Sequence, residues 1–131
     1  MKHVEGVAAI LIHNKKIAAF CRNYGDYTGF YEFVGGKIEA NETHAQALIR
    51  ECQEEIECDI IIDSFFKTIT FDYPDFQLQL HCYLCTPQSI DFKLKVHSDV
   101  QWVDKTNIET LPWLPADLSI MDDLKQLCYS L

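Results

Sequence analysis

The segment from Thr43 to Glu57 constrains the fold most, because its apolar residues recur at the spacing of one face of an α-helix. The Thr43 hydroxyl can cap the free amide groups at the start, and Gln46, three residues later, can reach back to the cap. The apolar positions form one stripe that must be buried: Ala45, Leu48, Ile49, Cys52 and Ile56. The sequence therefore predicts a helix that packs one face against a core.

Three glutamates of this helix, Glu51, Glu54 and Glu55, fall in an arc that begins beside the apolar stripe rather than opposite it. Two interpretations follow from that arc. In most acidic helices such a run is a solvated face. Alternatively, the three carboxylates converge at the edge of the core.

Strand-like segments surround the helix. Apolar, β-branched runs at 4–13 and 17–22, split by residues 14–16, predict a hairpin. Residues 65–71 and 76–85 predict two long paired strands, and 100–103 a short one. Gly35 and Gly36 follow the strand-like segment 30–34, where the chain must turn sharply or let another group approach its backbone. With no repeat or flexible linker, residues 1–131 are expected to form one domain.

The charge balance limits the partners of this chain. Twenty acidic and eleven basic side chains give a formal net charge of −9, which repels nucleic acid polymers. A small phosphorylated ligand remains compatible with this charge, because divalent cations held by clustered carboxylates can invert the local field. The acidic composition therefore points toward a metal.

The sequence predicts a cytoplasmic protein. Residues 1–5 run directly into a strand-like stretch without the pattern of a signal peptide, and apolar runs such as 7–12 are far shorter than the roughly 20 residues that span a bilayer. The six cysteines are scattered, mostly in apolar segments, and are expected to be reduced core residues. Only Cys82 and Cys85 have a ligand-like spacing, but on a strand they face opposite sides, so no zinc site is expected from them.

Residues 36–58 read GKIEANETHAQALIRECQEEIEC, which resembles the box that defines the Nudix family. Eight of the nine fixed positions match, and the exception is Glu57, where the family has the glycine that ends the helix. A left-handed residue other than glycine at that point costs on the order of 1 kcal/mol. The resemblance favours converging carboxylates over a solvated face.

The resemblance implies a magnesium-dependent hydrolase that cuts a nucleoside triphosphate between its α- and β-phosphates, with Mn²⁺ as the alternative metal. Magnesium prefers hard oxygen ligands, which glutamates on one helix supply. By resemblance, the metal ligands are the Gly35 carbonyl, Glu51, Glu54 and Glu55. Glu51 is also implied to help to activate water. Arg50 is placed in the catalytic set as an orienting residue that holds the carboxylates through its fork of donors.

Beyond the box, the chain resembles the MutT-like branch of the family, which acts on nucleoside triphosphates. Residues 30–33 resemble the segment that enters the nucleotide pocket, with Phe33 as a base contact. Residues 115–117 resemble a short element of that branch whose last residue reads the edge of the base, which implies this role for Asp117. Alternatively, Asp117 caps a helix at 118–127, and the two roles can coexist because the side chain has two oxygens. Arg22 is expected to reach the phosphates or the sugar, and its alternative is an ordinary surface arginine. Tyr73 is expected to stack on the base.

One departure concerns the chemistry directly. Many relatives carry a glutamate six residues before the tryptophan that matches Trp102, and here that position is Val96. By strand alternation, His97 and Asp99 face the opposite way from position 96, so neither is assigned to the metal. We therefore expect lowered activity or a larger role for Glu51 as the base.

The resemblance implies an α/β (α+β) Nudix fold, in which a curved mixed β-sheet is sandwiched between the box helix and a C-terminal helix. Trp102 and Trp113 are expected to bury against the sheet. The implied substrate is 8-oxo-dGTP, or CTP and modified cytidine nucleotides. The alternatives are a catalytically impaired nucleotide-binding module and a pyrophosphatase for ADP-ribose or nucleotide sugars, whose members tend to be longer. The expected partner is the nucleoside triphosphate, and neither a nucleic acid polymer nor a membrane is expected as a partner. The chain is expected to be a monomer or a homodimer.

Overall fold

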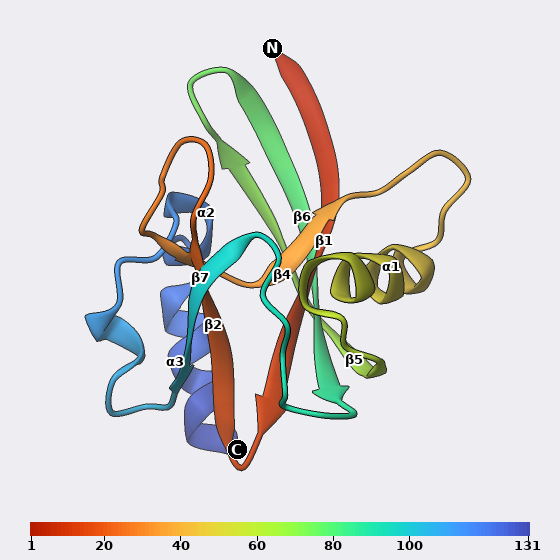
Figure 1. Cartoon of the computed structure of the whole chain (residues 1–131). Coiled ribbons are helices and arrows are strands. Elements are labelled where there is room, and N and C mark those ends of the chain that lie inside the picture. Colours follow the sequence, from red (N-terminus) through yellow and green to blue (C-terminus); the bar gives the residue numbers. More distant parts are fainter.

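The computed structural model describes residues 1–131 and shows one mixed sheet with helices on both of its faces (Figure 1). The elements are β1 (Lys2–His13), β2 (Lys16–Arg22), β3 (Tyr31–Glu32), β4 (Val34–Lys37), α1 (His44–Ile56), β5 (Ile60–Asp72), β6 (Phe76–Pro87), β7 (His97–Val103), the 3₁₀ turn η1 (Ile108–Thr110), α2 (Pro115–Leu118) and α3 (Met121–Ser130). No helix is long and apolar enough to cross a membrane.

Strand β1 organises the sheet because it pairs with three neighbours. It runs parallel to β6 and antiparallel to β4 and β2, and the main path through the sheet is β3-β2-β1-β6-β5. β7 pairs with β2, and β5 with β6. The hairpin of β1 and β2 is confirmed, with a tight turn in which Asn14 and Lys15 have positive φ angles of 51° and 62°. The expected mixed sheet is therefore confirmed.

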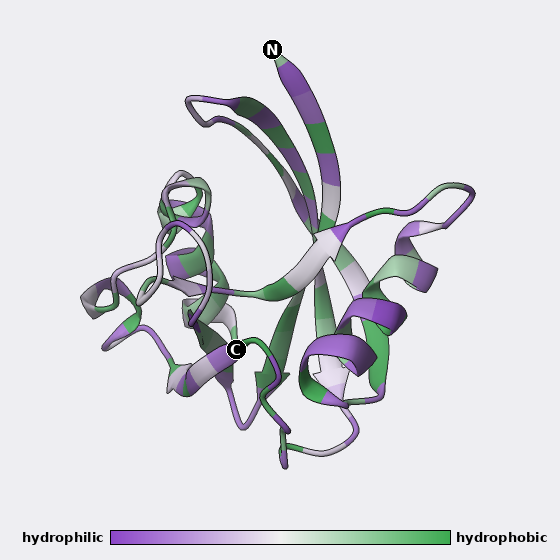
Figure 2. Ribbon diagram, turned by 45° about the horizontal axis from the view of Figure 1, so that its top comes forward, coloured by the Kyte–Doolittle hydropathy of each residue, from purple (hydrophilic) through white to green (hydrophobic).

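Successive side chains of β1 point to opposite faces of the sheet, and because residues 6–11 are all buried, the strand contributes to a core on each face. Figure 2 shows alternating hydrophilic and hydrophobic bands only toward the N-terminal end of this strand. Ala8 and Ile10 face α2 and α3, where they share a core with the fully buried Trp113. Val7 and Ala9 face α1 on the other side. The expected placement of the two helical regions on opposite faces is confirmed.

Helix α1 begins and ends where expected, but its buried face differs in part. Thr43 is the N-cap and forms the capping box with Gln46. Ala45 is exposed and Ile49 is 48% exposed, so their assignment to the buried stripe is wrong. The helix is rotated so that its Glu51 side, rather than its Ile49 side, faces the sheet, and the buried residues are Ala47, Leu48, Glu51, Cys52 and Ile56.

The C-terminal region also differs from the prediction. The expected helix at 118–127 is two helices, and Asp117 lies inside the first of them, α2, so its expected capping role is wrong. The reason is that Pro115 starts the helix three residues earlier than expected, at a position where a missing N–H costs nothing. Trp113 is buried as expected, whereas Trp102 is only partly buried.

The cysteines are free and buried, as expected. Cys82 lies in the core on the α3 side of the sheet, and Cys85 in the core on the α1 side. This placement confirms the prediction that the two residues face opposite sides of the sheet.

Candidate active site

The glycine pair in β4 lies where β1, β4 and α1 meet. A Cβ atom on Gly35 would overlap the carbonyl oxygen of Val7 in β1. A Cβ atom on Gly36 would lie 2.7 Å from the carboxyl carbon of Glu51 in α1. The backbone of β1 therefore excludes a side chain at position 35, whereas one at position 36 would displace the Glu51 carboxylate; the glycine there lets that carboxylate approach the backbone of β4.

Arg50 ties the acidic side chains of this region together. Its guanidinium holds Glu42 through two bonds, from Nε at 2.7 Å and from Nη2 at 2.9 Å, and it donates from Nη1 to Glu51 at 2.6 Å. It also reaches Glu54 at 3.2 Å and the Lys37 carbonyl at 3.0 Å. Hydrogen bonding to Arg50 lowers the pKa of Glu42 to about 2. The fork of Arg50 thus fixes carboxylates from two segments in one arrangement.

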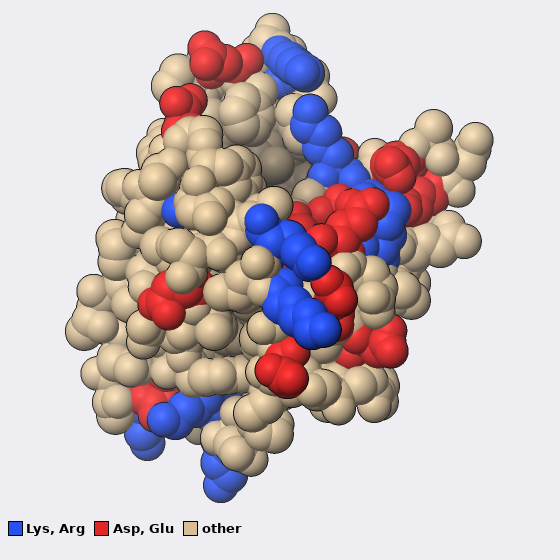
Figure 3. All heavy atoms as spheres, viewed as in Figure 1, with Lys and Arg blue, Asp and Glu red and all other residues tan.

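Glu51 and Glu55 form the buried part of the acidic cluster. Burial raises the pKa of Glu55, and its hydrogen bond with Glu51 and the negative charges of Glu51 and Glu32 raise it further, while a backbone hydrogen bond from Gly35 opposes the shift. Such crowding of carboxylates is unfavourable without a compensating cation or proton. Figure 3 shows acidic and basic side chains gathered over α1 on the face of the molecule in view.

Glu54 is placed differently from its two neighbours. Its side chain is 59% exposed and pairs with Arg50, four residues earlier on the helix. The expectation that three carboxylates converge therefore fits Glu51 and Glu55, whereas Glu54 lies on the outer side of the cluster. A helix turn of 3.6 residues explains this, because positions 51 and 55 are nearly superposed on one face and position 54 is displaced from them.

The residues present fit a hard divalent cation. Glu55 bonds to the backbone of Gly35, Glu51 lies against Gly36, and Glu54 adds a third carboxylate at the outer edge of the cluster. Magnesium prefers such all-oxygen sets, completed by water and phosphate. A cation there would relieve the repulsion that raises the pKa of Glu55. The space in front of the Glu51 carboxylate exists only because Gly36 has no side chain.

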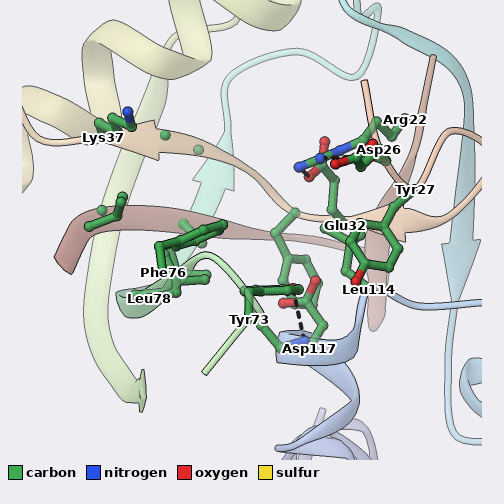
Figure 4. A pocket seen from close by; sticks show the side chains of 18 of the residues that line it. Arg22, Asp26, Tyr27, Glu32, Lys37, Tyr73, Phe76, Leu78, Leu114 and Asp117 are labelled. Atoms are coloured by element: carbon green, nitrogen blue, oxygen red, sulfur yellow. Dashed lines mark hydrogen bonds and ion pairs between the residues drawn. The ribbon is translucent and has the colours of Figure 1, made fainter. Parts of the chain in front are cut away.

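A cavity of about 530 Å³ extends from the glycine pair to α2. Its charged lining includes Arg22, Glu32 and Lys37, and its apolar lining includes Phe76 and Leu78 (Figure 4). This volume falls within the range of ligand pockets. The cavity therefore runs from the glycine pair, against which Glu51 of α1 lies, to a less polar region near α2.

A buried ion network lines one part of this cavity. Arg22 donates to Glu32 at 2.8 Å, and Nε2 of the fully buried His97 side chain lies 3.0 Å from the other carboxylate oxygen of Glu32. Burial alone would raise the pKa of Glu32, but the hydrogen bonds from His97 and Arg22 outweigh it and lower the pKa. Arg22 is therefore not an ordinary surface residue; its guanidinium lines the cavity while it holds Glu32.

Glu32 and His97 were not identified as site residues from the sequence. Strand alternation argues against His97 as a metal ligand, and the structure pairs it with Glu32 across β3 and β7. The signal in the sequence is a carboxylate between two aromatic residues, Tyr31 and Phe33, in the otherwise apolar segment 30–34. Val96, at the position where many relatives have a glutamate, is half-buried and offers no carboxylate.

Asp117 closes the end of the cavity near α2. It is only 3% exposed, and burial raises its pKa to about 8, with repulsion from Glu32 adding to the shift and Arg22 opposing it. A carboxyl group with this pKa is mostly neutral at pH 7 and can both donate and accept a hydrogen bond. The pair Tyr73 and Asp117 faces the same region of the cavity (Figure 4).

The two aromatic residues expected to contact a base both line the cavity. Phe33 is 5% exposed, and its ring centroid lies 5.2 Å from that of Trp113. The Tyr73 hydroxyl accepts a bond from the backbone amide of Ala116 at 3.2 Å, and its ring stacks on Phe76. That bond fixes the hairpin of β5 and β6 against α2.

Residues 2–124 match the family model described as the NUDIX domain. An 8-oxo-dGTP diphosphatase of Proteus vulgaris is 48% identical over 58 residues, which cover 44% of this chain and about half, 52%, of that relative. A CTP pyrophosphohydrolase of Escherichia coli (strain K12) is 28% identical over 123 residues, 93% of this chain and 91% of the relative. The solution structure of the E. coli ORF135 protein superposes with a TM-score of 0.81 at 27% identity, over 97% of this chain and 91% of that one.

Proposed function

The chain belongs to the NUDIX domain family and is a Nudix hydrolase, and from this premise we propose that it converts a nucleoside triphosphate to its monophosphate and pyrophosphate with Mg²⁺. One observation carries the proposal. The crowded Glu51–Glu55 pair lies against Gly36 and the backbone of Gly35, and these glycines line a cavity that ends at a buried carboxyl group, Asp117. A triphosphate and a base can occupy the two ends of that cavity together.

The phosphate end uses the acidic cluster. Glu51, Glu54, Glu55 and the Gly35 carbonyl would hold Mg²⁺, with Mn²⁺ as the alternative. Bound there, the cation would neutralise charge on the phosphate oxygens. Glu51, held at 2.6 Å by Arg50, is in our proposal the base that accepts the proton of the attacking water. Lys37 also lines the cavity beside the glycines, where its ammonium group can bind a phosphate.

The base end uses Phe33, Tyr73 and Asp117. A neutral Asp117 carboxyl group can donate one hydrogen bond and accept another, which suits a base edge that offers both kinds of group. Two relatives carry the names 8-oxo-dGTP diphosphatase and CTP pyrophosphohydrolase. We propose 8-oxo-dGTP, or CTP and modified cytidine nucleotides, as the substrate classes. Arg22 is proposed to contact the phosphates or sugar from the Glu32 side of the cavity.

The six free cysteines bear on where the enzyme works. All of them are buried thiols without a disulfide partner. Reduced thiols persist in the cytoplasm, and we propose this compartment as its place of action.

The test is pyrophosphate release from a panel of plain and oxidised nucleoside triphosphates in the presence of Mg²⁺. The panel includes ADP-ribose and a nucleotide sugar, with release of their monophosphates as the readout. Glu54→Gln removes a proposed metal ligand and should abolish turnover. Glu57→Gln makes the same charge change at the end of the same helix, outside the cluster, and should leave turnover intact. Equal rates in both variants would contradict the proposed role of the cluster.

A second candidate function is a nucleotide-binding module with impaired catalysis. The observation that favours it is Val96, which stands where many relatives have a glutamate. Tight nucleotide binding without product release from any member of the panel would support this function. A Glu51→Gln variant that binds metal but is inactive would support Glu51 as the base, whereas an active one would exclude that role.

A further inference from the structure

Two histidines and a glutamate meet on the α1 face of the sheet, outside the cavity described above. Glu5 lies on β1, His81 on the parallel neighbour β6, and His44 is the first residue of α1. One potential ligand atom from each lies within 4.8 Å of the other two. Nε2 of His81 lies 2.8 Å from a Glu5 carboxylate oxygen, and the two imidazole rings stack with their centroids 4.4 Å apart.

The second nitrogen of each imidazole is already held by a hydroxyl group. Nδ1 of His44 lies 2.7 Å from the Tyr83 hydroxyl, and Nδ1 of His81 lies 2.8 Å from the Thr68 hydroxyl. When a hydroxyl oxygen accepts a bond from Nδ1–H, the neutral tautomer carries its lone pair on Nε2. Metal-binding histidines are oriented in this way by a partner on the nitrogen that does not bind the metal.

We propose that Glu5, His44 and His81 form a second metal site, one that takes Zn²⁺. Two imidazole nitrogens and one carboxylate oxygen are a donor set for zinc, with water in the fourth position. This set differs in kind from the all-oxygen cluster of the box helix, which suits Mg²⁺. The inference does not depend on the proposed activity, since no residue of this site is in the glutamate cluster.

The burial of the side chains is consistent with a bound ion, and His44 is half-buried. The His81 side chain is 12% exposed and that of Glu5 is 55% exposed, so an ion can enter from solvent and still find one firmly packed ligand. Zinc at this point would connect the first turn of α1 to β1 and β6. The site is therefore a cross-link between the box helix and the sheet, which stabilises the fold rather than taking part in hydrolysis.

The test is metal binding by the full chain in excess Mg²⁺, which keeps the glutamate cluster occupied. Co²⁺ serves as the probe, because a four-coordinate site with nitrogen ligands absorbs strongly in the visible range, whereas a six-coordinate oxygen site absorbs weakly. We expect one equivalent of Co²⁺ to produce this absorption and Zn²⁺ to displace it. Zn²⁺ should also raise the melting temperature.

Variants assign the signal to the three residues. His44→Gln and His81→Gln should abolish the visible absorption. Tyr83→Phe and Thr68→Val remove only the partners of Nδ1 and should weaken Zn²⁺ binding about tenfold. His3→Gln is the matched control, because His3 is an exposed histidine of β1 outside the site, and it should bind as the unmodified chain does.

Two outcomes would overturn the proposal. The first is the absence of tetrahedral Co²⁺ absorption from a folded chain, as judged by circular dichroism. The second is absorption that survives in both histidine variants but disappears in Glu54→Gln, which would assign the ion to the box helix. Pyrophosphate release measured on the same samples separates this result from the proposed function, because loss of the zinc site should leave turnover by the Mg²⁺-loaded chain in place.

Discussion

Replacing Gly36 by alanine tests whether the Glu51 carboxylate must lie against β4. The added Cβ atom would lie 2.7 Å from the Glu51 carboxyl carbon and 2.7 and 2.8 Å from its two oxygens. Ordinary contact between carbon atoms begins near 3.5 Å, so the carboxylate must move by roughly 0.8 Å. Arg50, which holds one of these oxygens at 2.6 Å, resists the movement.

The displacement is small in space but large for catalysis. Misplacement of a reacting group by about 1 Å costs about 100-fold in rate, so we expect the kcat of Gly36→Ala to fall by about two orders of magnitude. Stability should change by only about 1 kcal/mol, because the group that yields is the end of a side chain and not the backbone. Pyrophosphate release gives the first quantity, and urea unfolding the second.

A double-mutant cycle with Glu51→Gln identifies the route of the effect. If the alanine acts by displacing Glu51, then Gly36→Ala should cost little further activity once Glu51 is glutamine. Full activity in Gly36→Ala would refute the reasoning. So would losses from the two substitutions that simply multiply, because the alanine would then act on some other part of the site.

Three further predictions concern stability and positioning. Burial raises the pKa of Asp117 from its usual 3.8 to about 8 in the folded state, so the unfolding free energy should fall as the pH rises between these values, by up to about 1.4 kcal/mol per pH unit. Asp117→Asn should flatten this slope, as measured by urea unfolding at pH 5 and pH 8. An unchanged slope would show that the group titrates normally. Glu57→Gly removes the strain of a left-handed backbone conformation, with φ of 50°, and should raise the unfolding free energy by about 1 kcal/mol. The loss of the exposed ion pair between Glu57 and Lys95 subtracts a small amount from this gain. A lower melting temperature would count against the prediction. Arg50→Lys loses the bidentate hydrogen bonds to Glu42 and should lower kcat roughly 10- to 100-fold, with a smaller change in KM. An unchanged kcat would show that Arg50 does not position the carboxylates.

Local signals in the sequence were enough to predict much of the fold. The capping box of Thr43 and Gln46 is confirmed, because both of its hydrogen bonds join residues three positions apart. The hairpin around Asn14 and Lys15 is equally local. The burial of Ile49 was predicted wrongly, since the rotation of a helix on a sheet depends on partners that are distant in sequence.

The candidate site shows the same division. The acidic cluster lies within one helix, so its spacing is visible in the sequence, although the outward turn of Glu54 is not. The pairing of Glu32 with His97 joins residues 65 positions apart and arises from the packing of β3 and β7 on β2. The cluster of Glu5, His44 and His81 likewise depends on the parallel pairing of β1 with β6.

The most direct test of the central claim is the identification of products by ³¹P NMR after turnover of the best triphosphate of the panel with Mg²⁺. We predict nucleoside monophosphate and pyrophosphate in equal amounts, and no reaction after the metal is removed with a chelator. Nucleoside diphosphate and orthophosphate, or turnover that persists without a divalent cation, would contradict the account.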